Sequence, residues 1–480
     1  MRRLLLPLLL LGFALNASAG TGKVVIVNID LPNVGFNDAT PAQPVGGNPG
    51  TTVGAQRMNV FQAAAARWTA MLDTNVDIIV QASFASMQCD DSGAVLASAG
   101  PRTFLKDFAS APRAAVWYPI ALANKFAGTD LGPTIPDVIT QFNGDVDNAE
   151  CLGDQDWYYG LDGNHGSDSD LYVVVLHELA HGFGISGAVG APGFRDEIPA
   201  IFDVLTLDRT AGLRWDQMTE QQREISMTNT GNLVWDGPYV TALLGRYLQP
   251  VTRLTITEPA AIARNFDIGT AAFGPVANAS ALTGRVVRAV DPANSEGPTT
   301  FDGCSAFSNA DAIRGNVALI DRGSPPAPAD PCTFVKKARH AQEAGATGVI
   351  IVDNARTTCQ PPSMGGDATD IIIPIISISS IDGDALKAQL TAGEAVRGGL
   401  RNDASQLAGA SQEGKMRLYA PCTEEPGSSV HHWDVVSTPN LLMEPAVNGD
   451  LLHGVDLTRY QLLDMGWSLP EKSGRRAPRR

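Results

Sequence analysis

Beyond its first twenty residues the sequence lacks any run of about twenty apolar residues, which is the length that a membrane-spanning helix needs. It also lacks a cluster of Lys and Arg outside its last few residues, and its formal net charge is -16. Proteins that bind nucleic acids use clustered basic side chains to neutralise phosphates, so we expect no nucleic-acid partner. These absences predict a soluble mature chain without a membrane span, and they leave its oligomeric state open.

Cysteine is scarce, with six residues in 480, and none has the spacing of a zinc knuckle. An even number of cysteines in an exported chain favours disulfide bonds, although six cysteines allow fifteen pairings. Grouping the cysteines by segment predicts three pairs: Cys89 with Cys151, Cys304 with Cys332, and Cys359 with Cys422.

The two ends of the chain have distinct compositions. Residues 1–19 carry two arginines, an apolar core and a final Ala-Ser-Ala, a pattern typical of a secretory signal peptide with cleavage after Ala19. We therefore expect secretion to an extracellular or periplasmic location. At the other end, residues 471–480 form a basic tail that we expect to be disordered.

The first part of the chain alternates strand and helix patterns, which predicts an α+β domain with a mixed α/β sheet. We expect the strand Val138 to Phe142 to lie at an edge of this sheet. An extended peptide can pair with an edge strand. The other expected elements are a helix, Arg57 to Asp73, and three strands, Lys23 to Asp30, Val76 to Ala82 and Ala115 to Ile120.

The stretch LYVVVLHELAHGFGIS contains the HExxH motif, with His177, Glu178 and His181. Side chains four residues apart lie on one face of a helix, so both imidazoles can reach a single metal ion while Glu178 lies beside them. This is the arrangement of a zinc peptidase, and we expect its helix over 171–184.

Acidic residues precede this helix: Asp162, Asp168 and Asp170. They allow a calcium loop, but their spacing fits no EF-hand, and helix capping explains them without a metal. Calcium is therefore possible but unsupported.

A zinc site of this kind needs a third ligand. A metzincin continues as HExxHxxGxxH, and here Gly184 fits, but Gly187 stands where the third histidine would be. The third ligand must come from elsewhere, and Glu197, Asp203 and Asp208 are nearby carboxylates that could serve, although such residues are more often surface charges.

From about 254 to 407 the sequence pattern changes, and it predicts short strands joined by loops rich in Gly, Pro and Ala. A strand, an Arg-Gly pair, a cysteine and a helix ending in Gly-Ala follow one another, and this order resembles a protease-associated (PA) domain, apart from an extra loop before Cys332. The resemblance implies an accessory module, in which Arg322 and Lys337 have structural rather than catalytic roles. The matching residues are Arg322, Gly323, Cys332, Phe334, Lys337, Ala341, Gly345 and Ala346.

Towards the end, HHWDVVSTPNLLMEP and LTRYQLLDMGW join HELAHGFGIS in a pattern that resembles leishmanolysin-type metzincins. In that family the histidine of a His-Trp pair is the third zinc ligand, and a methionine eleven residues later lies beneath the metal. The resemblance implies that His177, His181 and His432 bind one Zn²⁺, that Glu178 is the general base and that Met443 is the turn methionine. His431 does not fit this pattern, because it lies one residue before the histidine of the His-Trp pair.

Together these patterns predict a metzincin-like catalytic domain, residues 20–253 and 408–470, split by an inserted, β-rich PA domain at 254–407. The expected function is a secreted zinc metalloendopeptidase that hydrolyses proteins or peptides. A zinc aminopeptidase is an alternative, since PA domains also accompany aminopeptidases. A catalytically silent binding protein that uses the PA domain is another, although a purely structural zinc has no use for Glu178.

Overall fold

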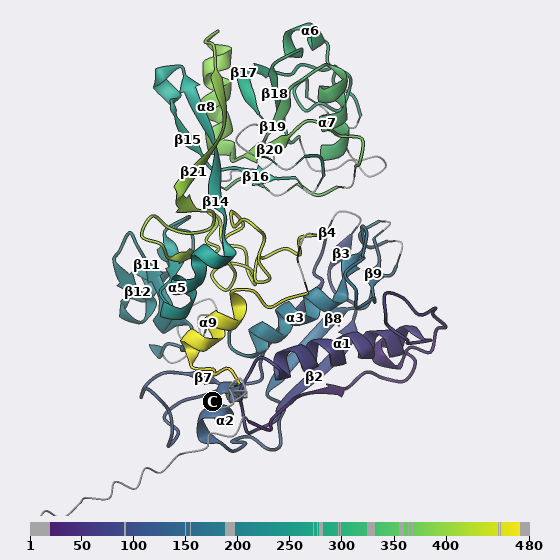
Figure 1. Ribbon diagram of the computed structural model, residues 1–480, viewed down its shortest axis with the longest axis vertical. Coiled ribbons are helices and arrows are strands. Elements are labelled where there is room, and N and C mark those ends of the chain that lie inside the picture. Colours follow the sequence, from purple (N-terminus) through teal and green to yellow (C-terminus); the bar gives the residue numbers. More distant parts are fainter. Residues whose placement is uncertain are drawn as a thin grey trace, which may run out of the picture.

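We analysed a computed structural model of the chain. It describes residues 20–470 apart from 91–92, 149, 154, 188–196, 272, 276, 278–281, 296, 298, 324–331, 355–359, 363, 367, 450 and 452. The chain forms two bodies, the lower one built from the first and last parts of the sequence and the upper one from the middle (Figure 1). The predicted signal peptide and the basic tail lie outside the described residues.

A four-stranded sheet organises the lower body. Its order is β1-β2-β8-β5, and β5 runs antiparallel to the other three strands. The prediction that Val138 to Phe142 forms an edge is therefore wrong: β8 lies between β2 and β5, and the edges are β1 and β5. The strands are β1 (Val24–Asn28), β2 (Ile78–Ala85), β8 (Val138–Asn143) and β5 (Ala97–Pro101).

Two helices pack along this sheet, α1 (Val53–Thr69) and α3 (Leu171–Gly182). Thr52 caps α1 by accepting a hydrogen bond from the Ala55 N–H at 3.2 Å, so this helix begins and ends four residues before the predicted range. The strand predicted at Ala115 to Ile120 is also corrected, because only Tyr118–Pro119 is extended and a helix starts at Ile120.

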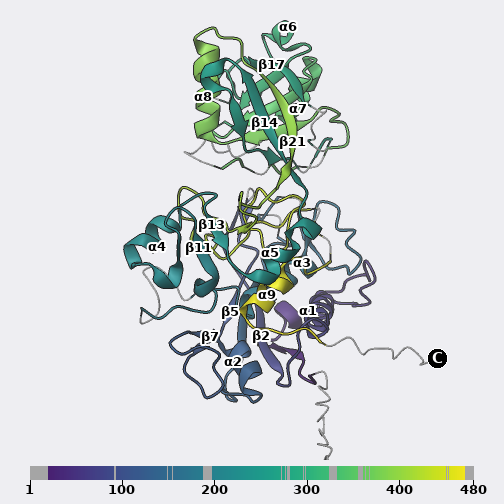
Figure 2. The ribbon, with the colours of Figure 1, turned by 60° about the vertical axis from the view of Figure 1, so that its left-hand side comes forward.

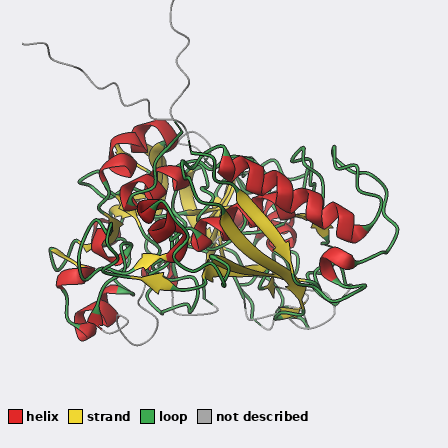
Figure 3. Cartoon of the chain, turned by 90° about the horizontal axis from the view of Figure 1, so that it is seen from below, coloured by secondary structure: helices red, strands yellow, loops and turns green. Residues whose placement is uncertain are grey.

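Short elements complete the lower body, and helices lie along its strands with long loops between them (Figure 3). The segment from 198 to 235 alternates short strands with short helical segments. The helices are α2 (Ile120–Ala127), α4 (Glu220–Ser226), α5 (Pro238–Tyr247) and α9 (Thr458–Met465); the strands include β11 (Thr206–Asp208), β12 (Leu213–Arg214), β13 (Leu233–Trp235) and β22 (Met416–Arg417).

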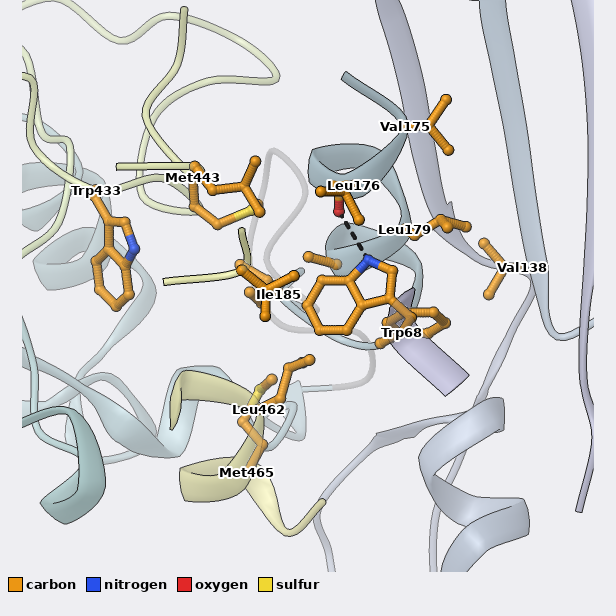
Figure 4. Close-up of a cluster of buried hydrophobic side chains, with 14 of the residues drawn as sticks. Trp68, Val138, Val175, Leu176, Leu179, Ile185, Trp433, Met443, Leu462 and Met465 are labelled. Carbon is orange, nitrogen blue, oxygen red and sulfur yellow. Dashed lines mark hydrogen bonds between the residues drawn. The ribbon is translucent and has the colours of Figure 1, made fainter. Parts of the chain in front are cut away.

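One hydrophobic core joins the two distant parts of the sequence. It contains buried side chains from residues 24–248 and from 410–467. In Figure 4, Met443 and Leu462 from the last part lie beside Leu176 and Ile185, and the Trp68 indole N–H donates to the Leu176 carbonyl at 3.2 Å. The end of the chain is therefore an integral part of the domain that its beginning forms.

The contact between α3 and the sheet depends on a glycine. A Cβ atom at Gly182 would lie 2.3 Å from Cγ1 of Val138 on β8. We expect Gly182→Ala to lower the free energy of unfolding by about 1–3 kcal/mol, because overpacking forces helix and strand apart. Gly245→Ala in α5 is the matched control: its Cβ would meet nothing within 4 Å, and alanine favours the helix. Denaturant unfolding measures both, and equal midpoints for the two variants would contradict this account.

The upper body is built on an eight-stranded sheet, in the order β15-β14-β21-β17-β18-β19-β20-β16. Helix α7 (Phe334–Glu343) packs on one face and α8 (Ser380–Thr391) on the other, each over its own cluster of buried side chains (Figure 2). The short helix α6 is Ala310–Ile313, and the strands are β14 (Pro250–Glu258), β15 (Arg264–Phe266), β16 (Gly269–Thr270), β17 (Thr283–Arg288), β18 (Val317–Asp321), β19 (Gly348–Val352), β20 (Ile375–Ile378) and β21 (Arg397–Leu407).

The chain enters the upper body through β14 and leaves it through β21. These strands pair antiparallel along their length, and Pro250 lies opposite Leu407. The two crossings between the bodies are therefore side by side.

Two of the predicted disulfides are confirmed, Cys89–Cys151 in the lower body and Cys304–Cys332 in the upper one. Cys359 lies outside the described residues, so its pairing with Cys422 stays a prediction. Disulfides favour an oxidising, non-cytosolic compartment.

Candidate metal centre

Helix α3 presents the HExxH side chains. Asp170 caps its N-terminus by accepting from the Tyr172 N–H at 2.9 Å, which agrees with the capping role rather than a calcium loop. The helix ends at Gly182, two residues before the predicted end. Gly184, with φ +126°, then turns the chain, so that the Ile185 N–H donates to the Ala180 carbonyl at 3.2 Å.

Three imidazoles converge at this helix. The Nε2 atoms of His177 and His181 lie 3.0 Å apart, and Nε2 of His432 lies 3.2 Å from the first and 3.1 Å from the second. His432 is 251 residues away from His181 in sequence. Tetrahedral ligands at the usual Zn–N distance of about 2.0–2.1 Å are separated by about 3.3 Å, so the three nitrogens fit one zinc ion.

The other ring nitrogen of each histidine is held by a backbone carbonyl. Nδ1 of His177 lies 2.6 Å from the Leu442 oxygen, Nδ1 of His181 lies 2.6 Å from the Ile185 oxygen, and Nδ1 of His432 lies 2.7 Å from the Ser428 oxygen. A carbonyl only accepts, so each Nδ1 carries the proton and each Nε2 presents a lone pair to the common centre. Three lone pairs at this separation repel one another unless a cation lies between them.

Burial keeps these imidazoles neutral. It lowers the pKa of His177 to about 3, that of His181 to about 4, and that of His432 well below its ordinary value. The neighbouring histidines lower the pKa of His177 and His432 further. Neutral imidazole is the form that binds a metal, so the centre is ready for one near neutral pH.

Glu178 lies beside the triad on the same helix and is only 7% exposed. Burial raises the pKa of its carboxyl group to about 8. A divalent cation in the triad would lower that pKa again, because a nearby positive charge favours the carboxylate. Glu178 thus has the position and the chemistry to accept a proton close to the metal.

Met443 lies in a turn of the chain, and its side chain is fully buried in the hydrophobic cluster of Figure 4. Its backbone carbonyl accepts from the Trp433 N–H at 2.7 Å, next to His432, and the residue before it, Leu442, supplies the carbonyl that orients His177. The Leu442 N–H in turn donates to Asp456 Oδ2 at 2.6 Å. The turn therefore orients His177 directly, through the Leu442 carbonyl. It also holds the backbone next to His432, through the Met443 carbonyl.

The carboxylates weighed as third ligands do not join the triad. Among the described residues, the three histidines alone form a group of that size able to hold a metal ion. Asp203 accepts from the Ala200 N–H at 2.8 Å, and Asp208 from Ser226 and Asn229. His431 is half-buried and points elsewhere, towards Gly187, whose Cβ would lie 2.6 Å from His431 Nε2.

Several supporting residues carry no signal in the sequence. Ser428, Leu442 and Ile185 act through main-chain carbonyls, which any residue offers. His453, which belongs to neither motif, has Nε2 2.6 Å from Asp170 Oδ2 and so supports the cap of α3. Of these supporting residues, Asp456 alone has a local sequence signal: it stands in an Asp-x-Thr pattern, in which an aspartate commonly caps a helix.

Comparison with known proteins identifies the upper body. Residues 282–386 match the PA domain family. This chain contains a PA domain. The match confirms the resemblance and lies inside the predicted insertion, whose wider limits, 254–407, stay a prediction.

Curated relatives match limited stretches of the chain. The human ER degradation-enhancing alpha-mannosidase-like protein 3 is 35% identical over 92 residues, which is 18% of this chain and 9% of that protein. Vacuolar-sorting receptor 1 of Pisum sativum is 28% identical over 158 residues, 32% of this chain and 24% of that protein. The chain thus spans a quarter or less of the length of each of these two relatives.

Similar solved structures include a zinc aminopeptidase from Bacillus subtilis, with 22% identity over 35% of this chain and 37% of that one, at a TM-score of 0.22. A subtilisin-like protease from Pseudoalteromonas sp. AS-11 has 20% identity over 32% and 34%, at a TM-score of 0.23. At these TM-scores the likeness carries no conclusion about activity. No helix among the described residues has both the length and the apolar character needed to cross a bilayer.

Proposed function

We propose that this protein is a zinc-dependent peptidase whose metal is held by His177, His181 and His432. The observation that carries the proposal is the convergence of three carbonyl-oriented imidazoles beside a buried glutamate. The finer proposal is a secreted endopeptidase of the leishmanolysin-like metzincin type, in which the PA domain interrupts the catalytic domain. It is supported by the spacing of His432 and Met443 and by the place of Met443 in the turn.

Each side chain then has a role. A zinc ion at the triad would acidify a bound water and polarise the scissile carbonyl. Glu178 accepts the proton of the attacking water and passes it to the leaving amine. The backbone carbonyls hold the imidazole rings in place during the reaction, and the buried surroundings strengthen the electrostatic interactions.

We further propose that the substrate backbone pairs with β5. This strand is one of the two edges of the sheet, and α3 packs against it. An edge strand offers unpaired main-chain groups to an extended peptide, so β5 takes the role that the sequence suggested for Val138 to Phe142.

Aminopeptidase activity is the second candidate. PA domains accompany enzymes of that kind, and residues 282–386 of this chain match that domain family. Among the described residues there is a single group of three histidines, which favours the endopeptidase, because one metal with a water suffices for internal cleavage.

Zinc removal tests the proposal. We expect the purified chain to digest casein, to lose at least about 99% of that activity with a chelator, and to regain it with added Zn²⁺, since the water is not activated without a metal. Mass spectrometry of a peptide with a blocked N-terminus distinguishes the candidates: internal fragments indicate an endopeptidase, whereas cleavage of the unblocked peptide alone, one residue at a time, indicates an aminopeptidase. Chelator-resistant digestion would contradict both.

A further inference from the structure

A polar hollow of about 550 Å³ lies at the junction of the two bodies. Its lining includes Arg417 and Asp434 from the lower body and Arg253, Asp267 and Gln360 from the upper one. The volume is within the range of small-molecule sites. Neither the proposed chemistry nor the PA match assigns a role to this hollow.

The first notable group in the hollow is the Asp434 carboxylate, which is only 1% exposed. Its Oδ1 accepts from Gln360 Nε2 at 3.0 Å and from the Val436 N–H at 3.3 Å. Its Oδ2 has no hydrogen-bond partner among the described residues, and neither has the buried Gln360 Oε1. Two acceptors left open at one site call for a ligand that donates hydrogen bonds, because a buried acceptor without a donor is costly.

The second notable feature is an excess of guanidinium groups. Asp267 serves two arginines, with Oδ1 3.2 Å from Arg253 Nε and Oδ2 3.8 Å from Arg417 Nη1. Arg417 Nε has no hydrogen-bond partner among the described residues. One carboxylate shared by two arginines leaves positive charge available, and arginine is well suited to bind a further carboxylate.

The opposite charges of Arg417 and Asp434 stand close together without forming an ion pair. The Asp434 N–H donates to the Arg417 carbonyl at 3.1 Å, so the two residues are adjacent across the backbone, yet the structure shows no salt bridge between their side chains. An α-amino acid carries an ammonium and a carboxylate on one carbon atom. It can therefore meet both residues at once.

We propose that this hollow binds a free α-amino acid with a polar side chain. Its ammonium donates to Asp434 Oδ2 and Gln360 Oε1, and its carboxylate accepts from Arg417 and Arg253. The amides of Asn232, Gln406 and Gln412 also line the hollow and suit a polar side chain. Since these groups come from both bodies, the ligand bridges them. This binding does not require the zinc chemistry proposed above.

Isothermal titration calorimetry of the full chain tests the site, with L-glutamine as the probe. We expect binding that weakens at least about tenfold for N-acetyl-L-glutamine, which lacks the ammonium, and for L-glutaminamide, which lacks the carboxylate. No binding up to about 10 mM, or equal binding of all three compounds, overturns the proposal. Binding that disappears when the metal is chelated places the ligand at the metal centre and overturns it as well.

Variants locate the ligand. We expect Asp434→Asn and Arg417→Gln to weaken glutamine binding at least about tenfold, while Asp311→Asn, at a fully exposed aspartate of the PA domain, leaves it unchanged. If Asp434→Asn fails to fold, Arg253→Gln and Gln360→Leu test the opposite wall of the hollow. Unchanged binding in the folded variants contradicts the assignment.

Discussion

Alanine in place of Glu178 is expected to reduce casein cleavage at least about a hundredfold while the protein keeps its metal. The loss follows because Glu178 is the acidic side chain that the HExxH helix places beside the triad, and no other group there is proposed to move the proton. Metal content by atomic absorption and the rate of casein digestion are measured on the same preparation, so that a lost metal is not mistaken for a lost base.

Glu224→Ala is the matched control for this experiment, since Glu224 lies exposed on α4, away from the triad, and its replacement should leave both readings unchanged. Cleavage by Glu178→Ala at the rate of the unmodified chain would end the assignment of the general base. Loss of the metal in that variant would instead assign Glu178 a part in holding the centre.

The second large effect is expected for His432→Ala. Removing one of three ligands should weaken zinc binding by more than about a hundredfold, because altering even a partner behind a ligand typically costs ten- to a hundredfold. Zinc affinity is measured by competition with a chromophoric chelator. Activity should fall in parallel, since the metal is needed to activate the water.

His431 provides a sharp control here, because it is the adjacent histidine and is half-buried, but it lies outside the triad. His431→Ala should keep zinc affinity within about threefold of the unmodified chain, as expected for a residue that is not a ligand. Full zinc occupancy in His432→Ala, combined with its loss in Asp203→Ala, would show that the third ligand is wrongly assigned.

The site was predictable from the sequence where its signal is a spacing of side chains. His177 and His181 are four residues apart on one helix, and the distance from His432 to Met443 is local as well. What the sequence could not show is the support behind them. His177 and His432 are oriented by carbonyls of Leu442 and Ser428, and a carbonyl is present at every position of the chain.

The fold was predictable in its elements and less so in their order. The helix α1 was predicted four residues too late, because its start was inferred from the apolar spacing that begins at Met58. The structure starts the helix at the cap residue Thr52 instead. The edge of the sheet was misplaced because strand order depends on long-range pairing: β5 joins β8 although some forty residues and a helix separate them in sequence. Periodicity describes which residues are buried in a strand, but not which neighbour it has.

The pairing of β14 with β21 changes what the long interval between His181 and His432 means for folding. Once the upper body has formed, Pro250 and Leu407 are neighbours, so the whole middle part of the sequence counts as a single step along the chain. The chain separation that His181 and His432 must then overcome to meet is that of the short remaining segments, rather than 251 residues. Early folding of the middle part would therefore bring the two segments that carry the candidate metal centre close together in space.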